Sequence, residues 1–169
     1  ITGMAGIGKS EVAKAYAQKN RKKYTNIIYL YYTGDLRKDI ANLTFADDSV
    51  EMNEEVRFQN HYKVMQKLHT DTLLILDNFN VLPKDEPFLK ELMKNDMQLL
   101  ITSRCRLKNY DSIEIKELDK EKELTELFYK HCPSAKRDPD SVSAIIEEVN
   151  CHTLTVCMAA LTLEASGME

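Results

Sequence analysis

The sequence contains no tryptophan and has only five glycines and four prolines among its 169 residues. Such a composition excludes collagen-like and low-complexity chains, in which glycine and proline dominate. No apolar run approaches the roughly 20 residues of a membrane-spanning helix, and no signal peptide opens the sequence. We therefore expect a cytoplasmic chain without membrane contact.

The cysteines also lack the pattern of a redox or metal motif. Cys105, Cys132, Cys151 and Cys157 form no CxxC pair, which favours reduced thiols in a cytoplasm. Two dipeptides, His131-Cys132 and Cys151-His152, leave a zinc site open as an alternative. Adjacent ligands fit zinc poorly, because zinc knuckles usually place two ligands a few residues apart.

No charge of one sign dominates the chain. It carries 23 basic and 27 acidic residues, a net charge of −4, and 43% of its residues are hydrophobic, which is typical of a globular protein. The basic cluster in residues 19–23 is interpreted as a solvated helix end, because no aromatic platform accompanies it. We expect no direct nucleic-acid contact.

Apolar runs without polar interruption alternate with helical segments in the first two thirds of the chain. Strands are predicted over residues 27–32, 73–76, 99–101 and 112–115. Helices are predicted over residues 10–23, 35–43, 54–68 and 88–95, with a polar surface loop over 47–55. This alternation indicates an α/β fold with a parallel sheet covered on both faces.

The last part of the chain contains only helical patterns, over residues 120–132, 140–149 and 153–165. We predict an α/β core over residues 1–117 and a small helical subdomain over 118–169. Ile1 and Thr2 directly precede a glycine-rich turn, whereas such turns normally follow a strand. We therefore expect that the sequence is a fragment that lacks the first strand of the core.

The strongest motif is Gly3-Met4-Ala5-Gly6-Ile7-Gly8-Lys9-Ser10, a full match to GxxxxGK[ST]. Glycines let the backbone curl so that successive N–H groups point at phosphate oxygens, and the following helix N-terminus favours the same negative charge. In this pattern, Lys9 reaches the β- and γ-phosphates and the Ser10 hydroxyl binds Mg²⁺.

The second motif is the apolar strand over residues 73–76, which delivers Asp77 at its carboxyl end, 67 residues beyond Ser10. An aspartate in this place holds Mg²⁺ in P-loop proteins. A turn that merely caps the strand is the alternative interpretation. The next residue is Asn78, which cannot take a proton from an attacking water, so a carboxylate base is missing there.

The third motif is Thr102-Ser103-Arg104, which follows the predicted strand over 99–101. Ligands of open α/β sheets gather at the carboxyl ends of the strands, and Arg104 is suited to contact a γ-phosphate there. Pairing of Arg104 with surface carboxylates is the alternative.

These three motifs, in this order and followed by helices, resemble the NB-ARC domain, the nucleotide-binding module of the STAND class of P-loop ATPases. That domain occurs in apoptotic activators, plant disease-resistance proteins and bacterial regulators. Residues 3–10 (GMAGIGKS) are similar to its P-loop, 73–79 (LLILDNF) to its Walker B strand and 99–104 (LLITSR) to its sensor-1 strand. Residues 112–131 resemble the strand and helix that lead into its lid, and 148–161 (EVNCHTLTVCMAAL) resemble the lid segment that usually contains Gly-Leu-Pro-Leu.

The resemblance implies a P-loop NTPase fold, a three-layer α/β/α parallel sheet with a C-terminal helical lid, and binding of ATP or ADP with Mg²⁺. Phosphates would be bound by residues 3–10 together with Glu11, the metal by Ser10 and Asp77, and the γ-phosphate by Arg104. Lys9, Asp77 and Arg104 would also serve in catalysis. Thr153 replaces the lid proline that packs near adenine, and Cys151 replaces the usual glycine.

The expected function is a nucleotide-operated switch. ADP would hold the core and lid closed, and exchange for ATP would open them and expose a surface for homo-oligomerisation. Asn78, in place of the common second acid, implies slow Mg²⁺-dependent ATP hydrolysis at most. Effector and sensor domains would lie outside this fragment. Two alternatives remain: a phosphotransferase that acts on a small-molecule acceptor, and an interaction module whose P-loop is vestigial.

Overall fold

The computed structural model describes residues 1–46, 48, 52–108 and 110–167. The chain divides into two compact units. The first consists of Ile1–Thr2 and Lys9–Ile113, and the second of Gly3–Gly8 and Glu114–Glu169. The glycine-rich loop therefore groups with the helical part of the chain, although its sequence position predicts that it belongs to the α/β core.

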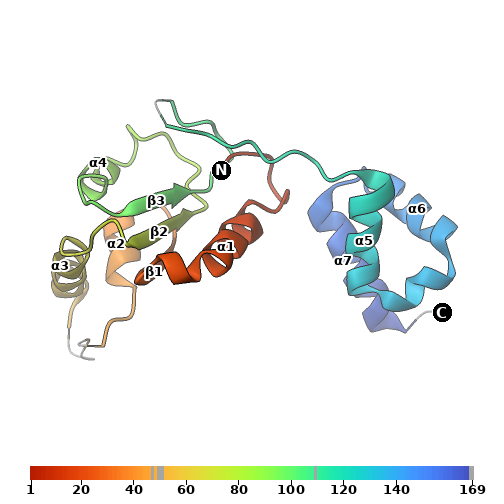
Figure 1. The fold of residues 1–169 in the computed structure, drawn as a ribbon, viewed down its shortest axis with the longest axis horizontal. Coiled ribbons are helices and arrows are strands. Elements are labelled where there is room, and N and C mark those ends of the chain that lie inside the picture. Colours follow the sequence, from red (N-terminus) through yellow and green to blue (C-terminus); the bar gives the residue numbers. More distant parts are fainter. Residues whose placement is uncertain (47, 49–51, 109, 168–169) are drawn as a thin grey trace. The chain divides into compact units, whose positions relative to one another are not determined.

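The first unit is built on a three-stranded parallel sheet with the order β1 (Asn26–Tyr31), β2 (Thr72–Asp77) and β3 (Gln98–Ile101), shown in Figure 1. β2 lies in the middle and is buried along its whole length, which explains its uninterrupted apolar sequence. Its register pairs Asp77 with Tyr31 of β1, and Leu76 with Ile101 of β3. The carboxyl ends of the three strands are thus aligned.

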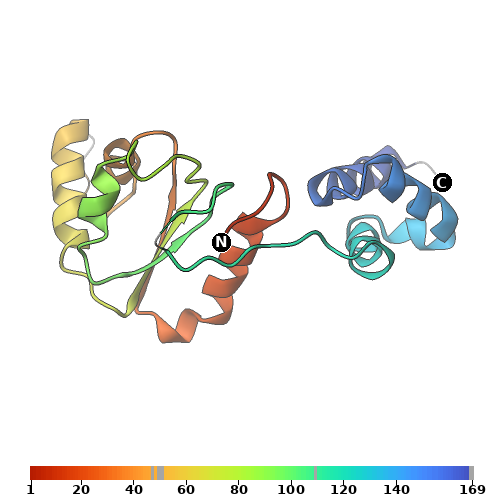
Figure 2. The ribbon, with the colours of Figure 1, turned by 90° about the horizontal axis from the view of Figure 1, so that it is seen from above.

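Helices cover both faces of this sheet. Figure 2 shows α1 (Lys9–Lys19) on one face and α2 (Leu36–Ala41), α3 (Glu54–Met65) and α4 (Phe88–Leu92) on the other. Ala13 and Ala17 of α1 pack against Leu73 and Ile75 of β2. The opposite face carries a larger apolar cluster, which includes Leu30, Leu74, Leu76, Leu36, Ile40, Phe58, Phe79 and Leu89. The expectation of an α/β fold is confirmed.

Polar side chains set the limits of several helices. Asp35 accepts hydrogen bonds from two backbone N–H groups at the start of α2, and Asn53 accepts one from Val56 at the start of α3. α1 ends at Lys19, because the side-chain Nδ2 of Asn20 donates a hydrogen bond to Tyr16 O. A 3₁₀ turn then covers Arg21–Lys23. The helix predicted to continue to residue 23 is therefore shorter.

The strand predicted over residues 112–115 is wrong. In this segment the backbone N–H of Thr2 donates to Ile113 O, but the residues form no strand of the sheet, and the Ile113 side chain is 70% exposed. Alternation of apolar and polar residues predicts a strand only if a neighbouring strand can pair along its length. Of the loop predicted over 47–55, residues 47 and 49–51 lie outside the described part, and α3 already begins at Glu54.

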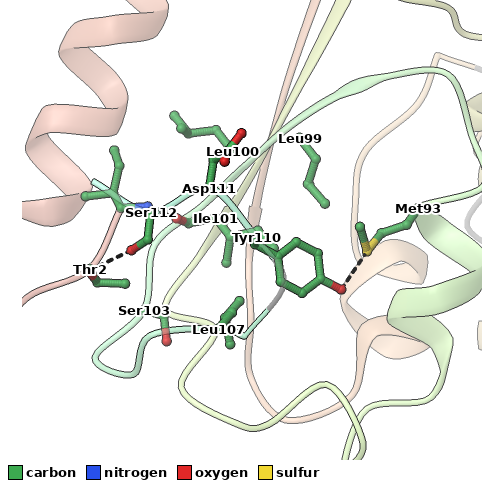
Figure 3. A pocket seen from close by; sticks show the side chains of 11 residues that line it. Thr2, Met93, Leu99, Leu100, Ile101, Ser103, Leu107, Tyr110, Asp111 and Ser112 are labelled. Atoms are coloured by element: carbon green, nitrogen blue, oxygen red, sulfur yellow. Dashed lines mark hydrogen bonds between the residues drawn. The ribbon is translucent and has the colours of Figure 1, made fainter. Parts of the chain in front are cut away.

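The edge of β3 that faces away from β2 borders a cavity of about 270 Å³. Figure 3 shows Leu99, Leu100, Tyr110 and Ser112 among the residues that line it. Ser103 forms a parallel bridge with Thr2 at the end of this edge. Within the described residues, this edge of the sheet pairs with Ile1 and Thr2 alone.

The described part of the second unit contains three α-helices, α5 (Thr125–His131), α6 (Pro139–Glu148) and α7 (Thr153–Ser166). A π-helical turn over Lys120–Leu124 precedes α5, and a 3₁₀ turn over Pro133–Arg137 precedes α6. Their common core consists of Leu124, Phe128, Cys132, Val142, Ile146, Val156 and Ala160. No helix in the described part has both the length and the apolar character needed to cross a bilayer.

Candidate functional site

The carboxylate of Asp77 is the centre of a hydrogen-bonded cluster in the first unit. Asp77 ends β2 and is only 2% exposed. Ser10 Oγ, in the first turn of α1, donates to Oδ1 over 2.8 Å, and Tyr29 Oη, from β1, donates to Oδ2 over 2.5 Å. Thr102 Oγ1, from the residue after β3, also donates to Oδ1. Four separate segments of the chain therefore meet at one buried carboxylate.

Burial and hydrogen bonding act in opposite directions on this carboxyl group. Burial raises the pKa of Asp77, but the hydrogen bonds from Thr102, Tyr29 and Ser10 outweigh it and hold the pKa below its ordinary value. Burial, followed by the hydrogen bond to Asp77, raises the pKa of the Tyr29 phenol well above its ordinary value. At neutral pH, Asp77 is therefore an anion and Tyr29 a neutral donor.

Two cations of the same unit influence this site. Partial burial lowers the pKa of Lys9, the positive charge of Arg104 lowers it further, and the carboxylate of Asp77 acts in the opposite direction. Arg104 is exposed, and its backbone N–H donates to Asn80 Oδ1 over 2.8 Å. The positive charges of Lys9 and Arg104 repel each other, so an anion bound beside both would be stabilised.

Asn78 adopts a left-handed conformation, with φ of 64°. Asparagine tolerates this conformation better than most residues. Its backbone N–H donates to Thr102 Oγ1 over 2.9 Å, and its side-chain Nδ2 donates to Tyr32 O over 3.3 Å. An aspartate cannot make the second bond, so the amide has a structural role at the position where the resembled family commonly has a second acid.

The glycine-rich loop, Gly3–Gly8, belongs to the second unit. Gly6 and Gly8 have φ angles of +71° and +106°, which side-chain-bearing residues rarely adopt. Met4 and Ala5 are exposed, whereas Ile7 is 5% exposed and anchors the loop. Such alternation of backbone conformation is typical of loops whose N–H groups bind an anion.

His152, directly before α7, contacts this loop. Its Nε2 lies 2.9 Å from Ala5 O and its Nδ1 lies 2.9 Å from Thr155 Oγ1. Because a carbonyl oxygen only accepts, Nε2 carries a proton and donates. A Cβ on Gly6 would come within 2.5 Å of His152 Cε1. The glycine at position 6 is thus required by the packing of His152 as well as by its backbone conformation.

The remaining predicted site residues lie elsewhere. Glu11 forms an exposed ion pair of 2.8 Å with Lys14, one turn further along α1, and does not join the Asp77 cluster. Thr153 is the first residue of α7, and its buried Oγ1 has no hydrogen-bond partner among the described residues. The structure therefore brings Ser10 into contact with Asp77 and leaves Lys9 under the electrostatic influence of Asp77 and Arg104, all in the first unit, while the loop and Thr153 belong to the second.

The described residues contain no group of three or more His, Cys, Asp or Glu side chains that could hold a metal ion. The two His/Cys dipeptides thus provide no zinc cage in this part of the chain, and the cysteines are free thiols. The oxygen ligands that Mg²⁺ prefers are nevertheless present in Ser10 and Asp77. Mg²⁺ is usually held by one or two protein groups together with phosphates and water, so this pair suits it.

Sequence reasoning missed Tyr29, His152 and the contact of Thr102 with Asp77. Thr102 belongs to the third motif, but that motif predicts Arg104 as its functional residue. Tyr29 shares β1 with Tyr31, and Tyr32 follows the strand directly, so only the fold distinguishes Tyr29 from the other two tyrosines. His152 carries one signal, its place in the lid-like segment, but the adjacent cysteine suggests zinc instead.

Comparisons with known proteins add no relative. No protein-family model matches the chain, and a search of curated proteins finds no match either.

Proposed function

We propose that this chain binds ATP and ADP with Mg²⁺ as a switch module of the NB-ARC type. The observation that carries the proposal is the hydrogen bond between Ser10 Oγ and Asp77 Oδ1, which joins the end of the GxxxxGKS motif to an aspartate 67 residues away. A magnesium ion that bridges nucleotide phosphates is held by one or two oxygen ligands of the protein, and a hydroxyl in contact with a carboxylate provides such a pair.

The other groups have complementary roles in this proposal. The backbone of Gly3–Gly8 would bind phosphate oxygens, and Lys9 would contact the β- and γ-phosphates. Arg104 would contact the γ-phosphate, and Thr153 would lie near adenine. When bound, Mg²⁺ would be held by Ser10 and Asp77 and would neutralise phosphate charge. Hydrolysis would be slow, because Asn78 supplies no base.

The switch requires that ADP and ATP favour different conformations, since a ligand with equal affinity for two conformations shifts neither. His152 supports a route for such coupling, because its imidazole donates to Ala5 of the loop that would receive the phosphates. Opening by ATP would expose a surface for self-association, with effector and sensor domains supplied by other parts of a longer protein.

The test is a calorimetric titration of ADP and ATP, with and without Mg²⁺, on the full-length protein. We expect ADP to bind more tightly than ATP, and Lys9→Ala to weaken both by at least tenfold, about 1.4 kcal/mol. Lys19→Ala is the matched control, because Lys19 lies at the other end of the same helix and is exposed. Size-exclusion chromatography with each nucleotide measures the change in self-association.

Each alternative has its own signature in these experiments. No nucleotide binding, or equal binding by Lys9→Ala and Lys19→Ala, contradicts the proposal and favours a vestigial P-loop. ATP consumption that depends on an added nucleoside or sugar favours a phosphotransferase. Equal affinities for ADP and ATP leave nucleotide binding intact but contradict the switch.

A further inference from the structure

The two carboxylate oxygens of Asp77 have different hydrogen-bond partners. Oδ1 accepts from Ser10 and Thr102, whereas Oδ2 accepts from Tyr29. Ser10 and Thr102 both lie within motifs that the sequence suggested. Tyr29 belongs to no such motif, yet its phenol is the group that engages the second oxygen.

The position of Tyr29 in the sheet makes this contact specific. In the register of β1 and β2, Tyr29 pairs with Ile75, and the residue opposite Asp77 is Tyr31. The phenol of Tyr29 therefore reaches two residues along the neighbouring strand to donate to the carboxylate, a diagonal that long side chains can span. Tyr31 lies closer in register, but its side chain is 54% exposed.

Tyr29 as a whole is partly exposed, whereas its hydroxyl is directed at the buried carboxylate. The side chain is 38% exposed, and Lys14 Nζ lies 6.0 Å from its ring centroid. The hydroxyl donates to a carboxylate that is itself almost completely buried, so the partly exposed ring delivers its donor to the interior of the cluster.

We propose that Tyr29 is a positioning residue, which holds the Asp77 carboxylate so that Oδ1 stays directed at Ser10 and ready for a magnesium ion. This inference rests on the proposed function. Groups that hydrogen-bond to a metal-binding carboxylate fix its orientation, and their loss typically lowers metal affinity by 10- to 100-fold. Magnesium is sensitive to such a loss because it demands nearly ideal octahedral geometry.

The test separates binding of the metal from binding of the nucleotide. For the wild type and Tyr29→Phe, ADP affinity is measured by calorimetry in excess Mg²⁺ and again in EDTA. We expect Tyr29→Phe to weaken the Mg²⁺-dependent affinity by about tenfold and to leave the affinity in EDTA unchanged. Unchanged binding in EDTA also demonstrates that the variant is folded. Tyr31→Phe is the matched control, and we expect it to behave as the wild type in both conditions.

Other outcomes overturn the inference. Equal behaviour of Tyr29→Phe and Tyr31→Phe shows that the phenol does not position Asp77. A parallel loss in Mg²⁺ and EDTA assigns Tyr29 a merely structural role, and tighter Mg²⁺ binding shows that the phenol competes with the ion. The ADP affinity of the wild type tests the proposed function by itself. If the wild type binds no ADP, or binds ADP equally with and without Mg²⁺, both proposals are contradicted before the variants are compared.

Discussion

The imidazole of His152 donates a hydrogen bond from Nε2 to the carbonyl oxygen of Ala5, over 2.9 Å and across 147 residues of sequence. The other ring nitrogen is held by Thr155 Oγ1, so the ring is fixed from both sides. The loop and the start of α7 are therefore in direct contact, which a change in either will disturb.

This contact predicts an energetic coupling between His152 and Gly6. We expect Gly6→Ala to destabilise the protein by about 2 kcal/mol, because the backbone there is left-handed and the new methyl group meets the imidazole. In a His152→Ala background part of that loss should disappear, giving a coupling free energy of at least ~0.5 kcal/mol in a double-mutant cycle of denaturant unfolding.

Gly8 provides the control for this cycle. Its φ is also positive, at +106°, but a Cβ at this position would meet no neighbouring atom of the described residues within 4 Å. Gly8→Ala and His152→Ala should therefore be additive to within ~0.5 kcal/mol. Additivity of the Gly6 pair as well would contradict the packing of His152 against Gly6.

Replacement of Cys151 by glycine should stabilise the protein. Cys151 has φ of 56° and follows Asn150, with φ of 52°, in the turn between α6 and α7. A left-handed conformation costs a residue with a side chain about 1–2 kcal/mol, so Cys151→Gly should raise the free energy of unfolding by about 1 kcal/mol. Cys157→Gly, in the middle of α7, should instead lower it by about 1 kcal/mol. A destabilising Cys151→Gly in thermal or denaturant unfolding would refute this account.

Asn78→Asp should not create a faster ATPase. The Asn78 amide donates to Tyr32 O and accepts from Asn80 Nδ2, so its side chain is already engaged. A carboxylate would face the Tyr32 carbonyl and lose a donor, which should cost about 1 kcal/mol of stability. Phosphate release at the wild-type rate, with a lower denaturant midpoint, is the expected result.

Asn78→Gly isolates the amide contacts in the same assay, because glycine accepts the positive φ without strain. It should lose stability through the missing side-chain bonds alone. A rise in ATP hydrolysis of tenfold or more in Asn78→Asp would show that the carboxylate does act as a base.

The loss of folding stability at acid pH should depend on Asp48. Hydrogen bonds from His61 and from the Phe45 backbone N–H hold the pKa of Asp48 below its ordinary value. A lowered pKa means that the group stabilises the folded state fully above its unfolded pKa, about 3.9, and loses this contribution as the pH falls through the folded-state pKa.

Asp48→Asn keeps an oxygen that can accept from His61 but removes the charge. We therefore expect the variant to be less stable than the wild type at pH 7 and to approach it as the pH is lowered below about 4. Thermal unfolding between pH 3 and 7 measures this, with exposed Asp85→Asn as the control. A difference in melting temperature that stays constant with pH would contradict the assignment.

Local sequence signals predicted most of the first unit, because β2 is buried, β3 is half-buried, and their apolar runs are short and unbroken. Asp77 and Ser10 could be recognised because each occupies a fixed position in a motif. The segment over 112–115 shows the limit of this reasoning, since its alternation indicates an amphipathic strand but cannot specify a pairing partner. Tyr29 and His152 could not be found, because their partners are distant in sequence and are specified only by the register of the sheet and the packing of the loop.

The edge of β3 beside Leu99 and Leu100 has a consequence for how the protein behaves in solution. Backbone N–H and C=O groups along a sheet edge form a template for another extended chain, and natural proteins normally shield such edges with charge, a bulge or a covering segment. Here the neighbouring cavity is lined by both apolar and polar side chains, and Asp111 is the one acidic residue among the described residues that line it. Preparations in which this edge stays open will be prone to intermolecular strand pairing, and the associated fraction will rise with the protein concentration.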